Sequence, residues 1–302
     1  MDPRLASALA AFCCLLWGSA YPAIKTGYEL FAIGTADIPA KLLFAGLRFA
    51  AAGVIVLAYC LVTGKSIAVR GKGEALRILG LGLAQTAIQY TFFYIGVANT
   101  SGSKSSVVNS TSTFFSAILA HFLYADDKLS RRKALGCAVG FLGVLAINWS
   151  GELLFEWKFM GEGFVVIAAL VISAAPLWGR KLSRRIDPMV LTGWQLLSGG
   201  LILAGAGAAL GGDLGPWSLG AGLDLGYLAL LSSVAFTIWT ILLRDNKVTA
   251  ITIFQFLIPV SGVLLSALFL GDSILEWRYL AALIAVSAGI VLVNSGAAKK
   301  AS

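Results

Sequence analysis

The residues best suited to bind a polar molecule lie in the stretch NTSGSKSSVVNSTSTFF, residues 99–115, which apolar sequence flanks on both sides. Its first five residues predict a short turn, and a helix follows. Within that helix Ser106, Asn109 and Thr113 recur at i, i+3 and i+7 and share one face. Hydroxyl and amide groups on one face can bond a polar solute in a cavity, or they can hold neighbouring helices together.

The polar pair on this face recurs 146 residues later, in TAITIFQFLIP. The shift places Ser106 on Thr252 and Asn109 on Gln255. A polar face turned toward lipid would be costly, whereas a face turned toward a cavity or a partner helix is satisfied. Because the pair is repeated, we expect cavity lining. Two further amides from a preceding apolar stretch are expected to join it: Gln85 and Gln89.

Two cations lie well inside apolar stretches, Lys25 and Arg48. A buried cation is costly unless it is paired or hydrated, so each is a candidate for binding a carboxylate or a phosphate. The alternative for Lys25 is that its side chain reaches the membrane surface. The alternative for Arg48 is a structural bond to backbone carbonyls.

An aromatic stripe precedes Lys25, because Trp17, Tyr21 and Lys25 recur every four residues on one helical face. Pro22 lies within this stripe, and Pro176 occupies a similar place later in the chain. Proline frees a carbonyl and kinks a helix, which is tolerated where the helix lines a cavity. We expect these kinks to flank a path, although the stripe could equally be packing.

The sequence lacks the constellations of common enzymes. The single histidine, His121, has no Cys or Asp partner at catalytic spacing, and the four cysteines have neither metal-ligand nor disulfide-framework spacing. We therefore expect no catalytic residue, no metal and no cofactor. All acidic residues fall in loops, tails or the ends of apolar stretches, which argues against a carboxylate proton relay at mid-membrane.

Composition indicates a membrane protein made of helices. The chain of 302 residues is 58% hydrophobic and 13% charged. A bilayer core about 30 Å thick needs roughly 20 apolar residues per helical span. Ten such spans are predicted: Leu5–Tyr28, Leu42–Val62, Ala75–Val97, Ser105–Leu123, Lys133–Ile147, Gly163–Gly179, Met189–Leu210, Leu223–Leu243, Ile251–Leu270 and Trp277–Val293.

The basic residues are distributed as a topology signal. With the N-terminus inside, 17 of the 23 lysines and arginines fall in inner segments and four in outer segments. This excess predicts cytoplasmic N- and C-termini. It also explains the net charge of +8 without nucleic acid as a partner.

The chain is also predicted to contain two inverted repeats. FLYADDKLSRRKALGCAVGFLGVLAIN, residues 122–148, overlays LFLGDSILEWRYLAALIAVSAGIVLVN, residues 268–294. LRFAAAGVIVLA, residues 47–58, likewise overlays WQLLSGGLILAG, residues 194–205. Five spans per half place the second half upside down relative to the first. Inverted repeats are typical of secondary transporters, with the substrate site between them near mid-membrane.

These motifs resemble the EamA branch of the drug/metabolite transporter superfamily. The resemblance rests on LLWGSAYPAIKTG, on LRF, on ADDKLSRRKALGCAVGFLGVLAIN and on its copy LGDSILEWRYLAALIAVSAGIVLVN. It divides the chain into two EamA units, 8–148 and 161–294. It implies an all-α membrane protein of ten helices. The members of this family are inner-membrane carriers, and most of them export amino acids and related metabolites.

The resemblance also implies further residues, because spans 1, 3, 4, 6, 8 and 9 of such carriers surround the cavity. The family often has a proline in span 4, where this chain has Thr113, but the counterpart Pro259 is present and is expected to kink span 9. The acid after spans 4 and 9 is Asp instead of the common Glu. The cavity residues brought in by the resemblance are Trp178, Ser233, Thr237 and Trp239.

We therefore expect an inner-membrane carrier for a small polar metabolite, most simply the efflux of an amino acid or derivative. A sugar-phosphate or nucleotide-sugar exchanger is the alternative, and it calls for a denser cluster of cations. A membrane enzyme or a sensor fits less well. The expected partners are the solute, the lipid bilayer and a second copy bound through a face of Gly136, Gly140 and Gly143.

Overall fold

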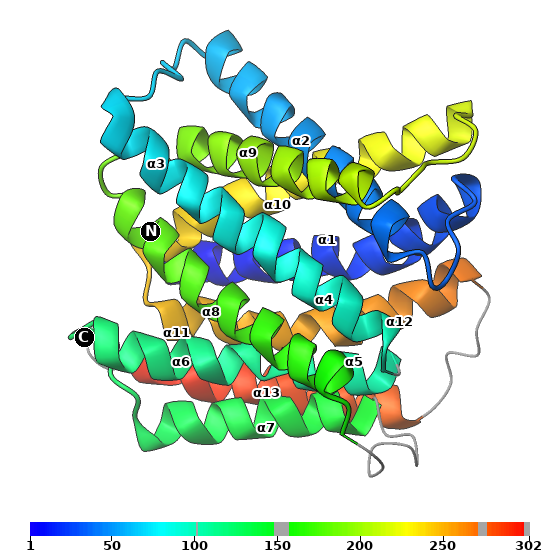
Figure 1. The fold of residues 1–302 in the computed structure, drawn as a ribbon. Helices are drawn as coiled ribbons and strands as arrows, with labels where there is room; N and C mark the ends of the chain where they lie inside the picture. Colours follow the sequence, from blue (N-terminus) through cyan, green and yellow to red (C-terminus); the bar gives the residue numbers. More distant parts are fainter. Residues whose placement is uncertain (101, 148–156, 271–276, 299–302) are drawn as a thin grey trace.

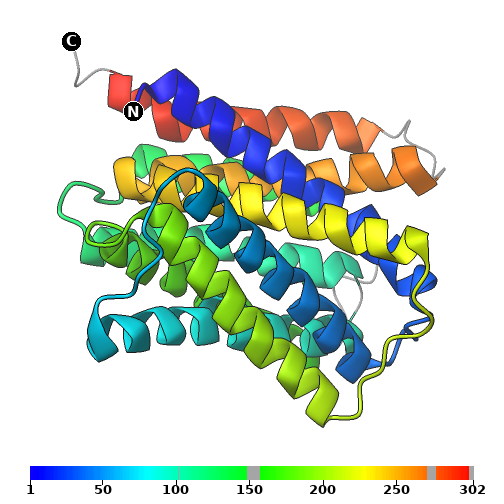
Figure 2. The same ribbon diagram turned by 90° about the horizontal axis from the view of Figure 1, so that it is seen from above.

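The computed structural model is a bundle of helices that run side by side (Figures 1 and 2). It describes residues 1–302 except 101, 148–156, 271–276 and 299–302, and within these described residues every regular element is a helix. The elements are α1 (Pro3–Leu30), α2 (Ile38–Val62), α3 (Gly71–Gly82), η1 (Leu83–Ile88), α4 (Gln89–Ala98), α5 (Gly102–Ser110), α6 (Ser112–Leu123), α7 (Arg131–Ile147), η3 (Phe159–Gly163), α8 (Phe164–Leu182), α9 (Pro188–Ala209), α10 (Leu219–Asp245), α11 (Val248–Thr252), η4 (Ile253–Phe256), α12 (Leu257–Leu270) and α13 (Trp277–Ala298).

Many of these helices are long and apolar enough to cross a membrane. Seven of the described segments meet that condition: Pro3–Leu30, Ile38–Val62, Gly71–Ala98, Phe159–Leu182, Pro188–Ala209, Leu219–Asp245 and Val248–Ser266. The other expected spans coincide with helices that are shorter or interrupted: α5 with α6, α7, and the Leu280–Ser295 part of α13. The chain is thus a multi-pass, all-helical membrane protein.

Aspartate and proline together begin the paired helices α2 and α9. The Asp37 carboxylate accepts the backbone N–H of Ala40 over 2.9 Å at the start of α2. Asp187 accepts the N–H of Met189 over 2.8 Å at the start of α9, where Pro188 is the first helical residue. An aspartate cap satisfies a free N–H and a first-turn proline has none to lose, so both helices begin at defined points.

Helices α2 and α9 pack closely along most of their length (Figure 2). Glycine permits this approach, because a Cβ at Gly200 would lie 2.3 Å from the backbone nitrogen of Ala50. A Cβ at Gly46 would lie 2.2 Å from the nitrogen of Ala204. Backbones this close gain dispersion contacts over a wide area, which is how helices associate where lipid removes the hydrophobic driving force.

The small-residue face of α7 is used within the chain. A Cβ at Gly136 would lie 2.8 Å from the carbonyl oxygen of Gly289 on α13, and one at Gly140 would meet the Phe256 ring. Helix α13 therefore covers the face that the sequence offered to a second copy. A homodimer stays a prediction, and the glycine face of α7 does not support it because α13 of the same chain occupies that face.

The remaining long helices form the centre of the bundle. Helix α1 packs against α10 and α12, and α8 packs against α4 and α6. The start of α1 and the end of α13 lie at the same end of the bundle (Figures 1 and 2). We call this the terminal end; it also carries the connections 63–70 and 183–187.

Candidate functional site

The first polar helix is interrupted, which corrects the expectation of one continuous helix over Ser105–Leu123. Helix α5 ends at Ser110 and α6 begins at Ser112. Between them the Thr111 hydroxyl donates to the carbonyl oxygen of Val108 over 2.6 Å. A threonine hydroxyl that bonds a nearby carbonyl competes with the helical ladder, which favours a break in this run of serine and threonine.

Its counterpart later in the chain is interrupted as well. The segment from Val248 to Leu270 is a short α11, the 3₁₀ segment η4 and then α12. Pro259 lies in the first turn of α12, as its third residue. Proline has no N–H for the carbonyl four residues earlier, which is that of Gln255 in η4, so a tighter 3₁₀ turn forms before it.

A π-helical segment lies on the third long helix. Segment η1 joins α3 to α4 and carries Gln85 and Thr86, while Gln89 is the first residue of α4. All three side chains are buried. The Thr86 hydroxyl accepts from the Gln195 amide over 2.5 Å. Single π turns frequently accompany functional sites, because they shift the facing of the side chains that follow.

Several side chains of the described residues have a buried polar atom without a hydrogen-bond partner, and some of them lie on these interrupted helices. Leaving such an atom unsatisfied costs about 1–3 kcal/mol, so a protein retains it where water or a ligand completes the bonding. Within the described chain the predicted site residues with such an atom are Arg48, Gln89, Asn109, Thr113, Thr237, Thr252 and Gln255. Ser106 is not among them, and its backbone carbonyl accepts the hydroxyl of Ser110 over 2.7 Å.

The predicted aromatic walls divide into two groups. The Trp17 ring lies edge-on to Trp239, with centroids 5.0 Å apart, and edge-on to Phe236 at 5.4 Å. Tyr21 instead lies against Gly262 of α12 and is 43% exposed. Trp178 is also exposed and lies against Gly80 of α3.

The other two prolines predicted as kinks lie inside long helices. Pro22 belongs to α1 and Pro176 to α8. Pro22 is followed by the exposed Lys25, which makes no hydrogen bond or ion pair with any residue that the structure describes. Exposure fits a lysine that reaches the membrane surface, and its role as an anion site stays a prediction.

Arg48 is buried in the middle of α2. Its Nε donates to the Ser232 hydroxyl over 3.1 Å, and its guanidinium lies 4.5 Å from the centre of the Phe49 ring. One of its terminal nitrogens, Nη1, is buried without a partner. A side-chain bond to α10 thus holds Arg48, in place of the backbone carbonyls weighed as its alternative.

Arg180 is a candidate that the sequence analysis missed. Its expected span ended at Gly179, but α8 continues to Leu182 and buries Arg180 to 4% exposure. The guanidinium lies 4.2 Å from the centre of the Tyr124 ring, and both Nε and Nη1 are buried without a hydrogen-bond partner among the described residues. Its place four residues after Pro176, on the same helical face, was the available signal.

Arg180 lines a pocket near the terminal end of the bundle. The pocket is narrow, with room for about one water molecule. Residues of α3, η1, α8, α9 and α10 surround it, and no acidic residue is among them. Its lining residues are Leu81, Gln85, Pro176, Gly179, Arg180, Leu191, Thr192, Gln195, Trp239, Thr240 and Leu243.

Two acidic side chains, those of Glu162 and Asp127, are buried near the ends of helices, and Asp224 is half-buried. Glu162 accepts from the Thr100 hydroxyl over 2.5 Å and lies 3.7 Å from the Lys104 ammonium. Asp127 pairs with a lysine and accepts a backbone N–H of α11. Asp224 has a buried oxygen, Oδ2, without a partner. No group of three or more His, Cys, Asp or Glu residues that could hold a metal occurs in the described part of the chain.

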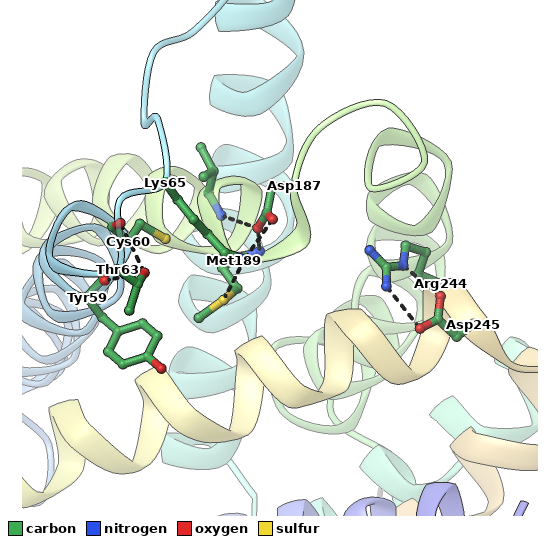
Figure 3. Close-up of polar contacts among 9 residues, drawn as sticks. Tyr59, Cys60, Thr63, Lys65, Asp187, Met189, Arg244 and Asp245 are labelled. Carbon is green, nitrogen blue, oxygen red and sulfur yellow. Dashed lines mark hydrogen bonds and ion pairs between the residues drawn. The ribbon is translucent and has the colours of Figure 1, made fainter. Parts of the chain in front are cut away.

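Polar contacts also tie helices together at the terminal end, as Figure 3 shows. The Lys65 ammonium donates to Asp187 over 2.8 Å and to the sulfur of Met189 over 3.3 Å. Arg244 forms two parallel bonds with its neighbour Asp245, at 2.7 and 3.0 Å. The Lys65 pair joins the connection after α2 to the start of α9 (Figure 3).

Known proteins resemble this chain over nearly its whole length. A sequence profile described as "EamA-like transporter family" matches residues 4–149 and 159–295. An "Uncharacterized inner membrane transporter YedA" of Escherichia coli K12 is 26% identical over 93% of this chain and 88% of its own length. A "Probable amino-acid metabolite efflux pump" of Salmonella typhimurium is 25% identical over 94% and 93%. A solved crystal structure shares the fold with a TM-score of 0.79, at 17% identity and 99% coverage of both chains.

Proposed function

The chain belongs to the EamA-like transporter family, and we propose that it exports a small polar metabolite, an amino acid or a derivative, across the inner membrane. The observation that carries this proposal is the pair of interrupted helices with a buried, unpartnered amide oxygen on each, at Asn109 and Gln255. Discontinuous helices at corresponding places in two halves are the usual pointer to a transporter's binding site.

The finer architecture in this proposal is ten spans arranged as two inverted repeats of five. The packing supports it, since each major contact has a counterpart under a shift of about 146 residues. The contact of α1 with α12 corresponds to that of α8 with α6, and the contact of α1 with α10 corresponds to that of α8 with α4. The paired helices α2 and α9 correspond to each other, as do α7 and α13.

Two hydrogen bonds support the same relation at the level of single residues. Arg48 on α2 bonds Ser232 on α10 over 3.1 Å. The repeat carries Arg48 to Gln195 and Ser232 to Thr86, and that pair is bonded over 2.5 Å. An equivalent bond between equivalent helices has no reason to recur in two unrelated halves.

The substrate class is proposed from the chemistry of the lining and from one relative. Amide and hydroxyl groups both donate and accept, so they suit the ammonium and carboxylate of an amino acid. The relative from Salmonella typhimurium is called a probable amino-acid metabolite efflux pump, which favours efflux of such a solute here. Alternating exposure of a central site to the two sides of the membrane, by rocking of the two halves, would move it.

The termini are proposed to lie in the cytoplasm. The excess of basic residues in the connections at the terminal end supports this orientation. The substrate would then enter from the terminal end and leave at the opposite end.

Transport by purified protein tests the proposal. The protein is reconstituted in liposomes, and each preparation is loaded with one radiolabelled L-amino acid. The rate of efflux is compared with that from protein-free liposomes loaded in the same way. We expect export of one chemical group of amino acids, and a loss of at least about tenfold in N109A and in Q255A. The proposal fails if no amino acid or amino-acid derivative moves faster than through protein-free liposomes.

A further inference from the structure

We propose that Arg180 anchors the carboxylate of the transported solute as it enters from the terminal end, so that the substrate must carry an anionic group. The inference rests on the proposed function and adds the charge of the substrate to it. It also moves the anion site from Lys25, where the sequence suggested it, to a buried guanidinium on α8.

The first support is the unfinished bonding of the guanidinium. Arg180 is 4% exposed, and its Nε and Nη1 are buried with no hydrogen-bond partner in the described chain. The Tyr124 ring, 4.2 Å away, stabilises the positive charge but accepts no in-plane bond. A desolvated arginine is retained where an anion can complete its bonding, and a guanidinium with unpartnered N–H groups can donate to a carboxylate oxygen.

The second support is the surroundings of that charge. No Asp or Glu lines the pocket, so the positive charge has no protein counterion there. The other polar lining groups are neutral, among them Gln85, Thr192 and Gln195. Thr192 and Thr240 are bonded to each other over 2.9 Å, and Gln195 is bonded to Thr86, so the amides and hydroxyls hold a fixed arrangement around the guanidinium.

The third support is the position of the pocket between the two halves. Its lining comes from α3 and η1 in the first half and from α8, α9 and α10 in the second. Trp239 lines it and lies edge-on to Trp17 of α1, with centroids 5.0 Å apart. The Trp239 ring would therefore lie between an anion held at Arg180 and the Trp17 ring of α1. The narrow pocket has room for about one water molecule, so it must widen to admit the carboxylate of a solute.

Binding to the full-length protein tests this proposal without relying on transport. Quenching of tryptophan fluorescence is measured with each L-amino acid. For the tightest binder we add two analogues, the amine that lacks its carboxylate and the acid that lacks its amino group. The proteins compared are wild type, R180Q, R180K and the control R184Q, which removes an exposed arginine just beyond the end of α8.

We expect the acid analogue to bind and the amine analogue to lose at least about tenfold in affinity. R180Q should show a similar loss, R180K a smaller one because it keeps the charge but not the planar guanidinium donors, and R184Q should match wild type. If R180Q is not folded by gel filtration, R180K decides.

Three outcomes would overturn the proposal: no amino acid binds wild type, the amine analogue binds as tightly as the amino acid, or the Arg180 variants bind like wild type. The same proteins in liposomes separate it from the proposed function. If R180Q still exports at the wild-type rate, the anion site at Arg180 is refuted and the proposed export function stands. Arg180-dependent binding without any export by wild type removes the exporter and leaves the site.

Discussion

The backbone N–H of Thr249 donates to the buried carboxylate of Asp127 over 2.9 Å. Of the adjacent acids 126 and 127, folding buries only Asp127, which is 0% exposed and also pairs with Lys133. The bond joins the connection after α6 to the first turn of α11, so it ties the two interrupted segments together near the terminal end.

Replacement of this buried acid should destabilise the fold. D127A removes a helix cap and leaves Lys133 without its partner, so we expect a loss of about 1–3 kcal/mol. A thiol-reactive dye can follow thermal unfolding in detergent, because all four cysteines are buried in the folded chain. The control D126A removes an exposed acid and should leave the melting temperature unchanged. Equal melting temperatures for D127A and wild type would contradict the structural role.

Substitution of Asn109 or Gln255 should reduce export without reducing stability. Alanine at either position removes a buried amide oxygen that has no partner, so N109A and Q255A should melt at or slightly above the wild-type temperature. Export should nevertheless fall by at least about tenfold, because substrate contacts are lost. The control N99A removes an amide that is exposed and bonded to the carbonyl of Ile95. Export in N109A and Q255A at the wild-type rate would show that these amides only join helices.

Glycine at the α2–α9 contact should tolerate no side chain. In G200A the new methyl would lie 2.3 Å from the backbone nitrogen of Ala50, which must move, so we expect a loss of about 1–3 kcal/mol. Gly205 lies on the same helix with no atom within 4 Å of a built Cβ. G205A should therefore be neutral or gain up to about 1 kcal/mol from helix propensity. Similar melting temperatures for both variants would mean that the two helices lie further apart.

The ion pair of Lys65 and Asp187 should give a weak, pH-dependent stabilisation. Burial alone would raise the pKa of Asp187, but the hydrogen bond from Lys65 and the N–H groups of Met189 and Val190 lower it below its ordinary value. The carboxylate is therefore favoured by folding, and its contribution is present above the ordinary aspartate pKa and lost as pH falls through the lower folded value.

The variant D187N keeps a capping oxygen but loses the charge. Since both partners are more than one third exposed, we expect a difference from wild type of less than about 1 kcal/mol at neutral pH. The difference should shrink as the pH is lowered below about 4. Thermal unfolding at several pH values measures it, and a gap that widens in acid would have the wrong sign.

Labelling of single introduced cysteines tests the orientation. The native cysteines are buried and give little background. Ser66 is exposed at the terminal end and Thr35 is exposed in the connection between α1 and α2. With cytoplasmic termini, T35C should react with a membrane-impermeant maleimide in intact cells, and S66C should react only after lysis. The reverse pattern would invert the proposed topology.

Periodicity was sufficient for much of the candidate site. Asn109 and Gln255 could be placed on polar faces because helical spacing is visible in the chain, and both carry buried, unpartnered oxygens in the fold. The break at Thr111 was not foreseen, since the same polar spacing fits a continuous helix, whereas Pro259 had predicted a kink in the helix that contains η4. Arg180 was counted among the basic residues of a connection because its helix appeared to end one residue earlier.

The sequence by itself determined the all-helical membrane class, the family and the residues that form polar faces, because hydropathy and helical period are properties of the chain alone. Only the tertiary structure decided which of several neighbouring charged residues of the same type is buried. Asp127 instead of Asp126, and Arg180 instead of Arg184, lie inside the bundle because α11 and the Tyr124 ring pack over them. Burial depends on neighbours far away in the sequence, and those neighbours turn an ordinary charge into a candidate binding group.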